Sequence, residues 1–262
     1  MEKKYRLLEN DTIAVNGRTL YRIEALRNFA DVRKGDKGGY VESEDNLSHD
    51  GNCWVYGDAC VSGNACVSGN AWVYGNARVY GNACVYGNAK VCDGAEVRGN
   101  AVVYDSAKVY GNAVVRGNAK VYGNAVVRGN AVVYDSAKVY GNAVVCDSAK
   151  VYGSAKVYSN AEVYGNAVVC DGAEVRGNAV VCGSAEVYDN ADYYVGKNVW
   201  SSGRFFTYTR SNRMWKVGCF HGTGEELIRK AYQDSEVSGR EYKRVVEYVE
   251  AMYADLENDK SK

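Results

Sequence analysis

The sequence contains no proline and only two histidines, and both shortages restrict what the chain can be. Proline cannot donate a backbone N–H, so its absence fits a chain in which every strand donates to a neighbouring strand. A zinc site of three histidines cannot be assembled within one chain from His49 and His221 alone. Sites built on several histidines of a single chain are therefore excluded.

Neither charge nor hydropathy indicates a nucleic-acid or membrane partner. The 32 Lys and Arg residues are balanced by 32 Asp and Glu residues, so no net charge attracts a polyanion. The chain has no apolar run of about 18 residues, and its opening MEKKYRLLEND lacks the apolar core of a signal peptide. We therefore expect a cytoplasmic protein that binds neither nucleic acid nor a membrane.

The abundant feature is a six-residue repeat. Every sixth residue from Val55 to Val187 is valine, alanine fills the fifth slot of each hexad, and Gly-Asn or a similar pair fills the third and fourth. A β-branched residue followed by Gly-Asn predicts a short strand and then a corner, because Gly and Asn tolerate positive φ. Valine and alanine should point inward, and the residues flanking each valine outward.

Over roughly residues 50 to 195 this pattern resembles the left-handed parallel β-helix of hexapeptide-repeat proteins. The resemblance implies three hexads per coil, a left hand and about eight coils. The fold class is thus an all-β solenoid, which we place at residues 49–198 between caps at 1–48 and 199–262. The segments KYRLLEND, NGRTLYRI and GNCWVYG are similar to hexapeptide-repeat proteins carried by bacteria and their phages.

Both flanks are suited to cap the strand edges that the terminal coils of a solenoid expose. At the N-terminus, Asn16-Gly17 between apolar-rich stretches predicts a β-hairpin. At the C-terminus we expect a hairpin over residues 204–220, turning near Ser211, and then two helices. Capping boxes place their starts at Thr223 and Ser238.

The last helix has one apolar face, which we expect to pack on the hairpin or on the final coil. That face consists of Tyr242, Val245, Val246, Val249, Met252, Tyr253 and Leu256.

The resemblance raises the question of catalysis, because the hexapeptide-repeat fold is known from acyltransferases and γ-class carbonic anhydrases. Those enzymes use a histidine base near an inserted loop, or zinc on three histidines. Here no loop interrupts the hexads and neither histidine lies among them. His221 follows Cys219 by two residues, so both would face one side of an extended strand, but we interpret this pair as accidental and His49 as structural. We expect no catalytic residue.

The nine cysteines show no CxxC motif and no Cys/His pair at metal-ligand spacing, so we expect reduced thiols, no metal and no cofactor. Cys66 and Cys84 should lie on one face in adjacent coils, where free thiols are favoured over a disulfide. Cys53 takes an inward slot, whereas the outward slots hold Cys60, Cys66, Cys84, Cys92, Cys146, Cys170 and Cys182.

The outward slots give the candidate binding surface. Read at the coil period, the slot after each valine stacks tyrosines on one face, and lysines precede the valines beside them. The predicted binding residues are Tyr86, Tyr104, Tyr122, Tyr140, Tyr158, Tyr194, Arg176, Lys120, Lys138 and Lys156. Such a surface has the composition of a protein interface. Stacked identical side chains can also have a purely structural role, because they stabilise the pairing of neighbouring strands. Glu162, Glu174 and Glu186, interpreted as a glutamate ladder, argue against nucleic acid.

The hypothesis is a non-catalytic protein-binding or scaffold solenoid, a phage accessory factor that inhibits a host enzyme or defence component through its tyrosine-rich faces. Self-association into a trimer or dimer uses the same surface. Two alternatives stay open: a hexapeptide-repeat acyltransferase-like enzyme, and an oligomer that sequesters a small ligand such as a nucleotide or sugar.

Overall fold

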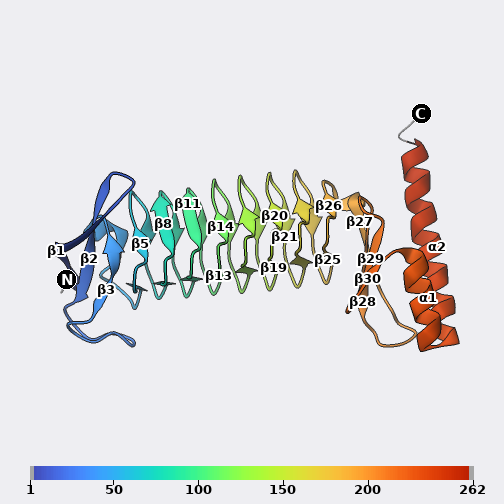
Figure 1. Ribbon diagram of the computed structural model, residues 1–262, viewed down its shortest axis with the longest axis horizontal. Helices are drawn as coiled ribbons and strands as arrows, with labels where there is room; N and C mark the ends of the chain where they lie inside the picture. Colours follow the sequence, from blue (N-terminus) through green and yellow to red (C-terminus); the bar gives the residue numbers. More distant parts are fainter. Residues whose placement is uncertain (1–2, 260–262) are drawn as a thin grey trace.

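The hexads wind into a straight rod of stacked coils, with a β-hairpin at one end and two helices at the other (Figure 1). The computed structural model describes residues 3–259. Each hexad supplies one short strand that ends on or just after its valine, and every third strand pairs in parallel, so that Val103 lies beside Val121. The predicted parallel β-solenoid of about eight coils, capped at both ends, is confirmed.

Three faces result, and each is a parallel sheet. The tyrosine face contains β6 (Cys66–Val67), β9 (Cys84–Val85), β12 (Val102–Val103), β15 (Lys120–Val121), β18 (Lys138–Val139), β21 (Lys156–Val157) and β24 (Glu174–Val175). The groove face contains β4 (Trp54–Val55), β7 (Trp72–Val73), β10 (Lys90–Val91), β13 (Lys108–Val109), β16 (Val126–Val127), β19 (Val144–Val145), β22 (Glu162–Val163) and β25 (Val180–Val181). The hairpin face contains β5 (Cys60–Val61), β8 (Arg78–Gly81), β11 (Glu96–Gly99), β14 (Val114–Val115), β17 (Val132–Val133), β20 (Lys150–Val151), β23 (Val168–Val169) and β26 (Glu186–Val187).

The core is a column of valine and alanine. The repeat valines from Val55 to Val187 and the alanines from Ala59 to Ala185 are buried and form one continuous cluster. Burying these side chains stabilises the rod by roughly 25 cal/mol per Å² of apolar surface. The column is narrow because a buried alanine follows every corner, so a larger side chain in that slot would overpack it.

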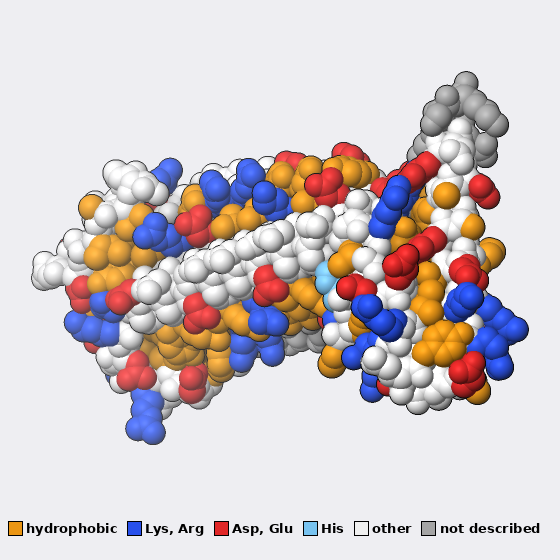
Figure 2. Space-filling model, turned by 45° about the vertical axis from the view of Figure 1, so that its right-hand side comes forward, with side chains coloured by type: hydrophobic (Ala, Val, Ile, Leu, Met, Phe, Trp, Pro, Cys, Tyr) orange, Lys and Arg blue, Asp and Glu red, His pale blue; other side chains and the backbone are white. Residues whose placement is uncertain are grey.

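The corners explain the recurring glycine. Gly123 has a φ of +71°, and a Cβ on it would lie 3.0 Å from the backbone N of Gly141 in the next coil. Where aspartate takes this slot, as Asp105 does at φ +58°, its carboxylate accepts a hydrogen bond from Gly123 N at 3.2 Å. Stacked corners form a white ridge along the rod, with hydrophobic and charged patches on either side (Figure 2).

The N-terminal cap is the predicted hairpin extended by a third strand. β1 (Tyr5–Val15) and β2 (Arg18–Ala25) turn at Asn16-Gly17, with φ of +52° and +76°. β3 (Lys37–Val41) then pairs with β5, so the hairpin continues the hairpin face. The first coil therefore begins at β3, and the expected boundary after residue 48 falls inside it.

The first coil is irregular. Val41 pairs with Val61 and Leu47 with Val67, twenty residues on, whereas Val55 pairs with Val73 at the regular eighteen. Between Leu47 and Val55 the chain is two residues longer than one hexad. Just before this stretch, the short helix η1 (Glu44–Asn46) ends in a buried asparagine.

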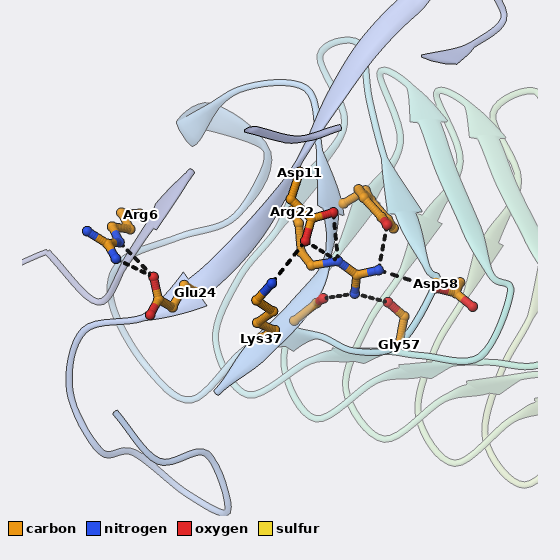
Figure 3. A network of polar contacts seen from close by, with 9 residues as sticks. Arg6, Asp11, Arg22, Glu24, Lys37, Gly57 and Asp58 are labelled. Atoms are coloured by element: carbon orange, nitrogen blue, oxygen red, sulfur yellow. Dashed lines mark hydrogen bonds and ion pairs between the residues drawn. The ribbon is translucent and has the colours of Figure 1, made fainter. Parts of the chain in front are cut away.

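An arginine fastens the cap to the rod (Figure 3). Arg22 of β2 lies 3.2 Å from Asp11 of β1, and it donates to the Gly38 carbonyl at 2.9 Å and the Gly57 carbonyl at 3.4 Å. Asp58 lies 3.7 Å from the same guanidinium. One side chain thus joins three cap strands to the first regular corner.

The C-terminal cap is larger than the predicted hairpin. After η2 (Asn190–Asp192), four antiparallel strands follow, then two helices. They are β27 (Tyr193–Lys197), β28 (Phe205–Thr209), β29 (Met214–Val217), β30 (Phe220–Gly222), α1 (Gly224–Asp234) and α2 (Glu236–Asp259). The expected boundary after residue 198 thus lies C-terminal to β27, although β27 already belongs to this cap.

One helix start is confirmed and the other is wrong. Thr223 Oγ1 accepts the Glu226 N–H at 3.3 Å, and the Glu226 carboxylate accepts the Thr223 N–H at 2.9 Å. The second capping box fails because α2 begins at Glu236, where Ser235 Oγ accepts the Ser238 N–H at 3.1 Å. Ser238 lies buried within the first turn of the helix.

The apolar face of α2 packs on the antiparallel sheet. Its central residues join one buried cluster with Phe206, Trp215 and the α1 residue Leu227. Leu256 is 41% exposed, because α2 runs beyond the edge of the sheet (Figure 1). Within residues 3–259, neither helix combines the length and apolarity needed to cross a membrane.

The candidate binding faces

The tyrosine ladder, defined as Tyr86, Tyr104, Tyr122, Tyr140 and Tyr158, forms as predicted. Neighbouring rings have centroids 4.8–5.1 Å apart and planes within 13° of parallel. The spacing equals that of paired strands, because each tyrosine follows the valine of an in-register parallel strand. The five side chains therefore form one rigid stack along the tyrosine face.

Stacking covers the ring faces and leaves edges and hydroxyls for contact. Tyr86, at the end of the stack, is 39% exposed, and the other four rings are half-buried. Burial raises the pKa of Tyr104, Tyr122 and Tyr140 above the ordinary value. These hydroxyls stay protonated well above neutral pH and can donate as well as accept.

A lysine row lies beside the ladder. Lys120, Lys138 and Lys156 pair in register on β15, β18 and β21. Lys156 Nζ lies 2.6 Å from Glu174 of the next strand, and Glu174 also accepts the Tyr158 hydroxyl at 3.1 Å. Within residues 3–259, Lys120 and Lys138 make no ion pair, so two positive charges remain for a partner.

Arg176 continues the ladder, but Tyr194 does not. Arg176 follows Val175 in the same slot, one coil beyond Tyr158. Tyr194 lies in β27 opposite Tyr208 and packs toward Phe206, with centroids 6.4 Å apart. Its assignment to the ladder was wrong, because the hexad frame ends at Val187 and η2 turns the chain away from the coil.

The three glutamates expected to form a ladder lie on different faces. Glu162 is in β22 of the groove face, Glu174 in β24 of the tyrosine face and Glu186 in β26 of the hairpin face. They are twelve residues apart, whereas side chains stack at eighteen. They therefore give no continuous negative strip.

The histidines stay apart from the tyrosine face. The His49 ring stacks on the Tyr5 ring with centroids 4.4 Å apart, and its Nδ1 accepts the Lys4 N–H at 3.2 Å. These contacts give His49 a structural role in the N-terminal cap. Cys219 lies in the turn between β29 and β30, whereas His221 belongs to β30 and pairs with Lys216. The premise that Cys219 and His221 share one extended strand is wrong, because Cys219 lies in the turn and the strand begins after it, at Phe220.

The cysteines are all free thiols. Cys66 Sγ lies 2.9 Å from Cys84 Sγ in the adjacent coil, as the spacing predicted. Burial raises the pKa of Cys66 to about 12, and the neighbouring Cys84 thiol adds to the shift. Cys92, Cys146 and Cys170 take outward slots yet are buried.

A groove on the groove face was not foreseen from the sequence. It has a volume of about 940 Å³ and lies where the C-terminal cap overhangs the last coils. The solenoid supplies Tyr164 and Val180, while the cap supplies Arg204, Phe205 and Lys216. Only the placement of the cap brings these two sets together.

The comparisons support the repeat fold. Residues 59–75, 71–87 and 77–93 match a family model described as the YdcK beta solenoid repeat. The matches begin 12 and 6 residues apart, which are multiples of the hexad. The chain is similar to these solenoids over its first coils. No curated protein matches the chain.

Proposed function

We propose that this protein is a non-catalytic binding or scaffold solenoid whose partner is another protein that docks on the tyrosine ladder and the lysine row. The observation that carries the proposal is the unbroken stack of five rings at 4.8–5.1 Å beside Lys120 and Lys138. Tyrosine is enriched in the residues that dominate binding energy at interfaces.

Rigidity favours this role. The ladder is held by parallel strands whose valines are fully buried, so its side chains lose little freedom when a partner binds. The ring edges supply apolar contact, the hydroxyls supply hydrogen bonds and the lysines supply charge. A partner with carboxylates spaced along an apolar strip would complement all three.

The biological setting is part of the same proposal. The similarity to hexapeptide-repeat proteins of bacteria and phages favours an accessory factor that binds and inhibits a host enzyme or defence component. Nine free thiols support a reducing, cytoplasmic setting. Self-association into a dimer or trimer would use the same aromatic face.

The test is a matched pair of variants. Tyr104 and Tyr122 stack at 4.8 Å on the tyrosine face, and Tyr134 and Tyr152 stack at 4.8 Å on the hairpin face. Changing each pair to serine removes equal aromatic area. Partner capture from a bacterial host lysate, quantified by mass spectrometry, and light scattering for oligomers should both respond to the Tyr104→Ser/Tyr122→Ser variant alone.

The proposal fails if the two variants retain every interaction and oligomer of the parent protein. It also fails if both lose them equally while remaining folded by circular dichroism, because the tyrosine face would then have no privileged role.

A further inference from the structure

The groove is long and open along the rod. Its floor and rim run from Tyr110, after β13, to Val180 in β25, which spans five successive strands of the groove face. Four steps of about 4.8 Å make this roughly 19 Å. An extended peptide of about six residues, at roughly 3.3 Å each, has the same length.

The groove carries more positive than negative charge. Arg128, Arg204 and Lys216 line it, and none of them forms an ion pair within residues 3–259. The carboxylates are Asp147 and Glu162. Asp147 is already engaged, since it accepts the backbone N–H of Gly165 at 3.2 Å.

The cations gather where the cap meets the solenoid. Lys216 Nζ lies 5.9 Å from the centre of the Tyr164 ring, which holds the ammonium over the groove face. Arg204 reaches toward Gly218, within 3.3 Å of the position that a Cβ there would take. Beside them Phe205 is 41% exposed, so an apolar ring stands next to two unpaired charges.

The floor is mostly apolar. Val126, Val144 and Val180 face outward from the groove face and remain half-buried. Glu162 lies in the same row between Val144 and Val180, so one carboxylate interrupts the valines. A peptide lying along the rod would direct alternate side chains to this floor and to the charged cap wall. The strands of the floor are already paired with one another, so recognition would depend on side chains and not on strand addition.

We propose that this groove binds an extended segment of a partner protein in which acidic residues alternate with aliphatic ones. Arg204 and Lys216 of the cap wall select the acidic side chains, and Arg128 adds positive charge beside the floor. The valines of the floor take the aliphatic side chains, and the length fits about six residues. This site lies on a different face from the tyrosine ladder and does not depend on the function proposed for it.

The experiment measures fluorescence polarisation of the full-length chain with two pools of labelled hexapeptides. In one pool aspartate alternates with valine, leucine or isoleucine, and in the other lysine replaces aspartate. We expect saturable binding of the acidic pool alone, weakened by added salt. The Arg204→Glu/Lys216→Glu variant should weaken it about tenfold or more.

The matched control reverses the same two residue types on the hairpin face, in an Arg116→Glu/Lys150→Glu variant. It should bind the acidic pool as the parent does, and circular dichroism verifies that both variants fold. A Val144→Ser variant, which keeps every charge, should also weaken binding. Equal loss in the control, no binding of the acidic pool, or binding of ATP in its place would overturn the proposal.

Discussion

The backbone N–H of Val180 donates to Thr207 Oγ1 at 2.9 Å, so a side chain of the cap takes the position of a carbonyl from a further coil. The other two faces end in the same way. The Glu174 N–H donates to Asn190 Oδ1 at 2.7 Å, and the Glu186 N–H donates to Ser211 Oγ at 2.7 Å. On the hairpin face the Tyr188 N–H also donates to Asp192 Oδ2, at 2.8 Å. Side-chain oxygens thus terminate all three sheets and protect edges that would otherwise recruit another strand.

Thr207→Val should open the last coil. Valine matches the shape of threonine but leaves the Val180 N–H without an acceptor, at a cost of about 1–3 kcal/mol. Amide hydrogen exchange should become faster at Val180 while exchange near Val115 stays slow. Thr207→Ser keeps the hydroxyl and should restore protection; failure to do so would show that the hydrogen bond is not what closes the edge.

Alkaline pH should destabilise the rod through its ladder. Burial raises the pKa of Tyr104, Tyr122 and Tyr140 in the folded chain above the unfolded value of 10.0. The unfolded chain therefore loses these protons first, and stability falls as pH rises through and above 10. Urea unfolding at several pH values should show a shallower decline when the three tyrosines are changed to serine. An unchanged slope would refute this account.

The thiols should react at very different rates. Cys219 is exposed in a turn, whereas Cys66 is half-buried with its pKa raised to about 12, so little thiolate forms there at neutral pH. A thiol reagent such as dithiobis-nitrobenzoate should titrate one fast group in the native protein. Cys219→Ser should remove that phase, and fast modification of Cys66, located by peptide mapping, would contradict the prediction.

Arg22→Lys should loosen the N-terminal cap by about 1–3 kcal/mol, because lysine cannot reach the Asp11 carboxylate and two carbonyls with one planar group. Limited proteolysis should then cut between β2 and β3 sooner. Arg6→Lys is the matched control, since Arg6 is exposed and Glu24 is its one ion-pair partner among residues 3–259 (Figure 3). Equal susceptibility in both variants would show that Arg22 has no special role.

The solenoid could be predicted because its information is local and periodic. Val103 and Tyr104 follow the same hexad rule as their counterparts in the next coil, so one frame fixes strand, core and stack together. The rule ends at Val187, and the predictions weaken there. Tyr194 lies past that limit, because Tyr193 already stands where the frame requires a valine.

The C-terminal cap and the groove could not be predicted in the same way, because they depend on contacts between residues that no short sequence motif links. Ser238 satisfies the capping-box pattern, but α2 begins two residues earlier, at Glu236. The residue before that start is Ser235, and its hydroxyl accepts the Ser238 N–H. The groove combines Tyr164 with Lys216, residues brought together only by the fold of the cap. Gly218, with φ +54°, likewise starts a turn that includes Cys219 and leaves only His221 in a strand.

The uniform interior also makes the rod a ruler. Since each coil repeats every eighteen residues, removing Tyr104–Val121 would join equivalent points of two neighbouring coils and bring the two caps closer by about 4.8 Å. Duplicating the same block would move them apart by one step. Deletion or duplication of coils can therefore change the distance between the two caps in steps of one coil, without any change to either cap.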